Sequence, residues 1–121
     1  MKRVLIIALA MMLASCVIEL DHGYPGEVTF TRAGGEQTVK GKSDFYDIEI
    51  IDHDNGGRYT STRTGGMIIT KNSWLTAKSA EISNQITLKV EPLPIGREPR
   101  TVTVYLDFKN NESTAIEIIQ K

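Results

Sequence analysis

The stretch TVTVYLDF at residues 101–108 alternates polar and apolar side chains along its whole length. In an extended chain successive side chains point to opposite sides, so the two valines, the leucine and the phenylalanine would share one side. A strand with one apolar and one polar face belongs to a sheet that covers a core on one side only. This stretch therefore predicts a layered β fold.

Shorter runs with the same alternation recur along the chain. They lie at residues 28–30, 37–41, 46–50, 86–90 and 113–120, separated by glycine-rich or polar turns. In the third run Tyr46 would share a face with Ile48 and Ile50. Residues 77–82 could form one helical turn, but no segment after residue 26 has a sustained helical repeat. The sequence thus predicts an all-β domain over residues 27–121, an antiparallel immunoglobulin-like β-sandwich of about seven strands.

The only cysteine, Cys16, ends the motif Leu13-Ala14-Ser15-Cys16, which follows a positive start and a short apolar run. That order is typical of a secretory signal, and the run is too short to span a membrane. The motif resembles the signal of bacterial lipoproteins, in which the cysteine receives a diacylglycerol and becomes the new N-terminus. We predict a signal peptide over residues 1–15, lipidation of Cys16, and a place in the cell envelope at the outer membrane. The sequence does not indicate whether the protein faces the periplasm or the cell surface.

Cleavage before Cys16 would remove 15 of the 121 residues, and the loss of Lys2 and Arg3 would take the formal charge from −1 to −3. A mildly acidic chain predicts no basic patch, and so neither nucleic acid nor anionic lipid headgroups as a partner. The membrane would be reached through the lipid on Cys16 alone. Residues 16–26 have no period and are predicted to form a flexible tether with Tyr24 exposed.

Short motifs are spread over the domain in a fixed order, namely VTF at 28–30, GG at 34–35, QTV at 37–39, WL at 74–75, ITLKV at 86–90 and IEIIQ at 116–120. On these motifs the domain resembles the BACON family, immunoglobulin-like sandwiches of secreted and surface proteins in gut-type bacteria. The resemblance implies a sandwich fold, a buried Trp74 and a carbohydrate-related role. The chain departs from the family in a proline-rich loop at 91–99, in Phe45-Tyr46 where a tryptophan is usual, and in extra sequence between 52 and 66.

The run Asp52-His53-Asp54-Asn55-Gly56-Gly57 is the most suggestive cluster for a metal ion. Oxygen atoms of Asp52, Asp54 and Asn55 beside a glycine turn could bind calcium, provided that the two carboxylates converge. The spacing does not fit an EF-hand, and the same residue types dominate hairpin turns. We therefore expect a plain turn, with calcium as the alternative, and no other cofactor.

Two long loops, residues 52–66 and 92–99, are the expected recognition surface, because loops on a rigid sandwich commonly carry binding. The candidate contact residues in or near them are Tyr59, Arg63, Arg97, Arg100 and Tyr105. Tyrosines offer a flat contact face, and arginines can grip carboxylates. The alternatives for Arg97 and Arg100 are that they bridge a neighbouring strand or simply stay hydrated.

No nucleophile–base pair or phosphate loop assembles in the sequence, so we predict a protein without enzymatic activity. The first hypothesis is a lipid-anchored binding or adhesion module that recognises a glycan or a partner protein through its loops. The alternative is a structural accessory lipoprotein that docks by strand addition and has no ligand of its own. Glycan binding would require two exposed aromatics on one surface, whereas docking would require a free sheet edge or an exposed apolar patch.

Overall fold

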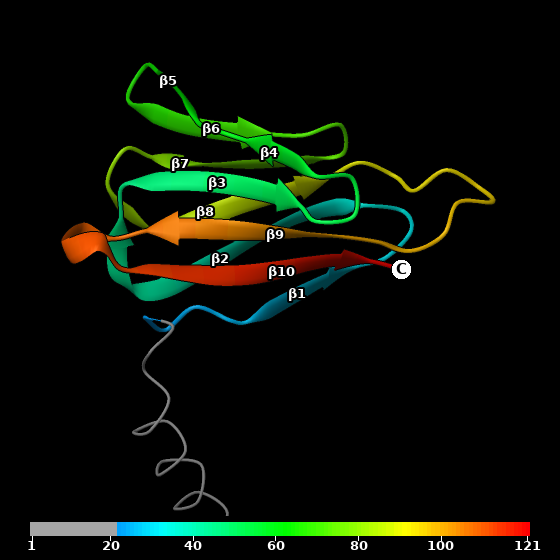
Figure 1. Ribbon diagram of the computed structural model, residues 1–121, viewed down its shortest axis with the longest axis horizontal. Helices are drawn as coiled ribbons and strands as arrows, with labels where there is room; N and C mark the ends of the chain where they lie inside the picture. Colours follow the sequence, from blue (N-terminus) through cyan, green and yellow to red (C-terminus); the bar gives the residue numbers. More distant parts are fainter. Residues whose placement is uncertain (1–21) are drawn as a thin grey trace, which may run out of the picture.

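The computed structural model describes residues 22–121, in which two five-stranded β-sheets pack face to face (Figure 1). The predicted all-β sandwich is confirmed, with ten strands in place of about seven. The strands are β1 (Glu27–Phe30), β2 (Gly35–Phe45), β3 (Asp47–Asp52), β4 (Gly57–Tyr59), β5 (Thr62–Thr64), β6 (Met67–Lys71), β7 (Leu75–Ala80), β8 (Ser83–Val90), β9 (Arg100–Asp107) and β10 (Ser113–Gln120). A short 3-10 helix, η2 (Lys109–Asn111), joins β9 to β10. Over residues 22–121, no helix has the length and apolarity needed to cross a membrane.

The first sheet has the strand order β1-β10-β9-β3-β4, and the second has the order β2-β8-β7-β6-β5. Neighbouring strands are antiparallel except for β1, which runs parallel to β10. The stretch that predicted the fold forms β9 in the middle of the first sheet. Its inward side chains Val102, Val104 and Leu106 are at most 1% exposed, which confirms the alternation.

The core lies between the two sheets and is built from their inward-facing apolar side chains. Trp74 is 7% exposed, as predicted for a core tryptophan. A hydrogen bond crosses the core, because the buried Thr70 hydroxyl of β6 donates to the Ile48 carbonyl of β3 at 2.8 Å. The run at 46–50 was predicted to place Tyr46 on the same face as Ile48 and Ile50. This prediction is wrong, because Tyr46 precedes β3 and is 42% exposed.

Two segments differ from the sequence predictions. Residues 77–82 form no helical turn, because residues 77–80 continue β7, with Ala77 and Ser79 inward and Lys78 outward. The extra sequence over 52–66 contains two short strands: β4 adds to the edge of the first sheet and β5 to the edge of the second. This segment therefore passes from one sheet to the other. Both edge strands that it forms have three residues, which is too short to favour pairing with a strand of another chain.

The predicted tether is partly built into the domain. Residues 16–21 lie outside the described residues, but residues 22–26 pack on the sandwich, and Tyr24 is 1% exposed, so its predicted exposure is wrong. Its ring lies 5.9 and 6.1 Å from the rings of Phe108 and Phe45, and its hydroxyl donates to the Ser43 carbonyl at 2.8 Å. Burial, then the charge of Asp44, raises the pKa of Tyr24 to about 12. The phenol is therefore a neutral donor at physiological pH.

The outer faces of the two sheets carry opposite charge. On the second sheet the exposed outward positions include Lys40, Lys71, Lys78 and Lys89. On the first sheet the outward positions include Glu27, Glu49, Asp107 and Glu117. The prediction that no basic patch survives in the mature chain is therefore wrong. The net charge of the chain does not show which face of which sheet each charged side chain occupies.

The acidic face contains a like-charge cluster that should make stability depend on pH. Burial raises the pKa of Asp107, and the carboxylates of Asp47 and Glu49 raise it further. The folded-state pKa lies above the unfolded one, so ionised Asp107 destabilises the fold at neutral pH, and the penalty disappears as pH falls through the ordinary aspartate value of about 4.

We therefore expect Asp107→Asn to raise the free energy of unfolding at pH 7 by about 0.5 kcal/mol, in the range for like charges directly opposite in a sheet. The gain should vanish near pH 3, where the wild-type carboxyl is protonated. Urea unfolding at both pH values measures it, with the exposed Asp54→Asn as the control. An equal gain at both pH values would contradict the electrostatic cause.

Candidate functional site

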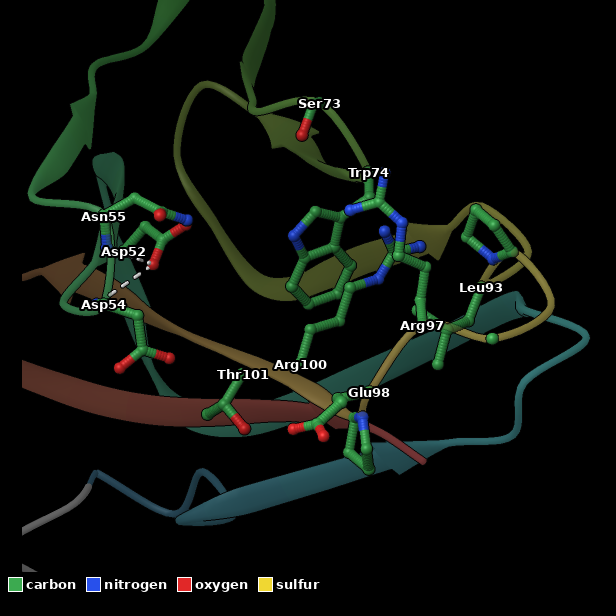
Figure 2. Close-up of a pocket in the computed structure, with 13 residues that line it drawn as sticks. Asp52, Asp54, Asn55, Ser73, Trp74, Leu93, Arg97, Glu98, Arg100 and Thr101 are labelled. Atoms are coloured by element: carbon green, nitrogen blue, oxygen red, sulfur yellow. Dashed lines mark hydrogen bonds between the residues drawn. The ribbon is translucent and has the colours of Figure 1, made fainter.

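A surface hollow of about 650 Å³ lies at one end of the sandwich, between the two loops predicted to carry recognition (Figure 2). The turn after β3 forms one wall, the loop between β8 and β9 forms another, and Trp74 lies between them. The described chain enters at the opposite end, where the His22 ring stacks on Phe108 at 4.0 Å and contacts Glu112 at 2.8 Å (Figure 1). The hollow is therefore separated from the chain entry by the full length of the strands.

The first wall is a turn held by its own aspartate. The Asp52 carboxylate, which is 7% exposed, accepts hydrogen bonds from the backbone N–H groups of Asp54 and Asn55 and from the Asn55 side chain, at 3.0–3.2 Å. The Asp54 carboxylate points away from that of Asp52 (Figure 2). The expected plain turn is present, and the convergence that calcium requires is absent. Within residues 22–121, no group of three or more His, Cys, Asp or Glu side chains is placed to hold a metal ion.

Arg100, the first residue of β9, is held inside the structure rather than hydrated. Its Nε donates to Gln120 Oε1 at 2.7 Å, its Nη2 donates to the carbonyls of Glu91 and Pro92, and its guanidinium lies 4.5 Å over the Trp74 ring. Burial, then the charge of Arg97, lowers the pKa of Arg100, while Glu91 opposes the shift. For Arg100 the hydrated alternative is therefore wrong, and the predicted bridge to a neighbouring strand is confirmed. It acts as a clamp between β9, β10 and the loop.

The second wall is a stiff loop that displays an isoleucine. Leu93, 6% exposed, anchors the loop, and the Arg97 N–H donates to the Pro94 carbonyl to close a turn with Ile95 and Gly96 at its centre. Gly96 has φ +84°, which suits the third position of a type II turn. The Arg32 guanidinium donates to the carbonyl of Arg97 at 2.8 Å and so holds the last residue of the turn in place. Ile95 is 102% exposed at the tip.

Arg97 supplies an unpaired cation beside this tip. Its exposed side chain has no hydrogen bond or ion pair within the part of the chain that the structure describes. The Glu98 side chain also lines the hollow (Figure 2). We call this end of the sandwich, with residues 94–98 at its tip, the loop end. It can offer an apolar contact through Ile95 and charged groups of both signs through Arg97 and Glu98.

The other three candidate residues lie elsewhere. Tyr59, on β4, is half-buried and packs against the core. Arg63, on β5, donates to the Tyr46 carbonyl at 2.7 Å and contacts Asp47 at 3.6 Å, so it ties the second sheet to the first. Tyr105 points outward from β9, as predicted, on the acidic face. The structure brings Arg97 and Arg100 together and leaves these three apart.

The aromatic pair that sugar stacking would require is not assembled in residues 22–121. Tyr59 and Tyr105 lie on opposite sides of the first sheet, and Trp74 is covered by Arg100. Tyr46 is exposed, but it lies at the chain-entry end, where it lines a hollow of about 320 Å³ with Ile82. Ile95 was missed by sequence reasoning, although a lone isoleucine amid prolines and a glycine is the signal that could have found it.

No family model and no curated protein matches the chain, so the BACON resemblance stays a prediction. Among solved structures, the chain is similar to a structure described as a Bacteroides ovatus GH5 xyloglucanase in complex with a XXXG heptasaccharide. The TM-score is 0.49 at 15% sequence identity, and the match covers 79% of this chain and 17% of that chain. The chain therefore matches a small part of that enzyme's length.

Proposed function

We propose that the protein is a lipid-anchored binding module of the bacterial cell envelope, without catalytic activity, whose loop end docks a partner protein. The lipoprotein-type motif that ends at Cys16 supports the anchor. Six Cα–Cα steps separate Cys16 from His22, which reach at most about 20 Å. The chain-entry end would therefore stay close to the lipid surface. β9 extends roughly 23 Å from that end to Arg100, so the loop end would face away from the membrane.

The observation that carries the docking proposal is the display of Ile95. A fully exposed isoleucine exposes apolar surface to water, and the turn that holds it is hydrogen-bonded to Arg32 and flanked by prolines. A side chain presented on a preorganised turn loses little conformational freedom on binding, which favours affinity. The unpaired Arg97 beside it would add orientation by meeting a carboxylate of the partner.

A sheet edge is less suited to docking than this loop. The longest edge strand, β2, is already engaged, because the Lys42 N–H donates to the His22 carbonyl at 2.8 Å and the Gln37 side chain donates to the Thr29 carbonyl. Strand addition there would have to displace both contacts. The loop end needs no such rearrangement.

The proposal is tested with the full-length chain in cells that process lipoproteins. A photo-crosslinking residue at position 95 should give a discrete protein adduct, identified by mass spectrometry, and Arg97→Ala should weaken that adduct about tenfold. The matched control is a crosslinker at Ile82, which is 64% exposed at the chain-entry end and should not give the same adduct. Cys16→Ala should move the protein out of the detergent phase in phase partitioning.

The outcomes separate the two parts of the proposal. Identical adducts from positions 95 and 82, or none from 95, would contradict docking by the loop end. Retention of the Cys16→Ala protein in the detergent phase would contradict the lipid anchor. Binding to neutral glycans on an array, lost in Arg97→Ala, would assign the loop end to a glycan instead.

A further inference from the structure

The outer face of the second sheet carries an ordered array of lysines and threonines. We call it the lysine–threonine face and define it by Lys40, Lys71, Lys78 and Lys89 with Thr38, Thr76 and Thr87. The registers place these residues in rows across the strands: Glu36, Lys89, Thr76 and Lys71 in one row, and Thr38, Thr87 and Lys78 in the next.

The array concentrates unpaired positive charge. Neighbouring strands lie about 4.8 Å apart and alternate residues about 6.8 Å apart, so the Cα atoms of Lys71, Lys78 and Lys89 form a triangle with sides of about 8–10 Å. None of the four lysines forms an ion pair within residues 22–121. The same holds for Glu36, the one carboxylate in these rows. The face is the outer side of one of the two packed sheets, and so a side wall of the sandwich (Figure 1).

We propose that the lysine–threonine face binds an acidic polysaccharide, at a site separate from the loop end. Ammonium groups spaced along the outer side of a sheet suit an extended chain with repeated carboxylates or sulfates, which binds by releasing counterions. The threonine hydroxyls between the lysines donate and accept hydrogen bonds, as a polyol requires. One threonine pair is already aligned across the strands, since the hydroxyls of Thr38 and Thr87 lie 3.3 Å apart.

Nucleic acid fits this face less well. Single strands are held largely by stacking on aromatic side chains, and the rows contain none. A lipid surface also fits less well, because the described chain begins at an end of the sandwich and the face is a side wall (Figure 1).

The test measures binding of the full chain, purified in nonionic detergent, to polygalacturonate as the acidic polymer and dextran as the neutral one. The variant Lys78→Gln/Lys89→Gln removes two charges from the face. The control Lys109→Gln/Lys121→Gln removes two exposed charges elsewhere, so both variants change the net charge equally. Circular dichroism verifies that both stay folded.

We expect the wild type to bind polygalacturonate and not dextran, and the face variant to bind at least tenfold more weakly at 50 mM salt. The slope of log K against log salt should fall by roughly one unit per lysine removed, while the control stays within about twofold. Equal loss in the control would show a net-charge effect and overturn the proposal. Equal binding to dextran, equal or tighter binding to duplex DNA, or a preference for anionic over neutral vesicles that the face variant loses, would overturn it as well.

Discussion

Tyr24→Ala should lower the free energy of unfolding by about 3–5 kcal/mol, the usual range for removing a buried aromatic side chain. The ring is 1% exposed, it contacts Phe45 and Phe108, and its hydroxyl satisfies the Ser43 carbonyl. Urea unfolding measures the loss. Tyr24→Phe keeps the ring and should cost about 1 kcal/mol, the value of one hydrogen bond.

Gly41 supplies a second test of the same contact. A β-carbon at position 41 would overlap the Tyr24 ring, so Gly41→Ala should destabilise the wild type. In the Tyr24→Ala background the ring is gone, and the same substitution should cost little. A double-mutant cycle isolates this coupling. Additive effects, or a loss below 1 kcal/mol in Tyr24→Ala, would return residues 22–26 to the role of a tether.

Gln120→Leu should lower the free energy of unfolding by about 3 kcal/mol, because it removes the hydrogen bonds of a buried side chain and leaves the Nε of Arg100 without its acceptor. Gln120 is 0% exposed near the end of β10. Its Nε2 donates to the carbonyls of Thr31 and Glu91 at 3.0 and 2.9 Å, and its Oε1 accepts from Arg100 at 2.7 Å. The side chain thus joins the last strand to the β1–β2 connection and to the start of the β8–β9 loop.

The control for this prediction is Gln85→Leu, at an exposed outward position of β8, which should change the free energy of unfolding by less than about 0.5 kcal/mol. Gln120→Glu keeps the acceptor for Arg100 but loses the donor to the two carbonyls, so it should also destabilise. If Gln120→Leu is as well tolerated as Gln85→Leu, the Arg100 clamp does not depend on Gln120, and the account of the second wall is wrong.

The fold was largely predictable, while the site was predictable only in part. Alternation along TVTVYLDF reflects a period set by the backbone of one strand, so it could be read without knowing any neighbour. Parts of the two predicted loops line one hollow, while their role in recognition stays a prediction. Tyr59, Arg63 and Tyr105 lie away from that hollow, because a side chain's neighbours come from strands far away in the sequence.

Arg100 illustrates the same limit. The sequence offered a ligand grip, a bridge to a neighbouring strand or a hydrated side chain, and it could not tell which; the structure shows the bridge, from β9 to Gln120 on β10. Its partners are Trp74, on the connection before β7, and Gln120, on the last strand. Such a network depends on how sheets pack, and no local pattern carries that information.

By itself, the amino-acid sequence determined the β-sandwich class, the positions of most strands and the polarity of each strand's two faces, since these follow from side-chain alternation over a few residues. Tertiary structure alone decided that Tyr24 belongs to the core, that Arg100 is a clamp, and that Lys71, Lys78 and Lys89 gather on one wall. The physical reason is register. Each strand contributes one or two charges to its outer face, and only the alignment of neighbouring strands brings those charges within about 10 Å of one another.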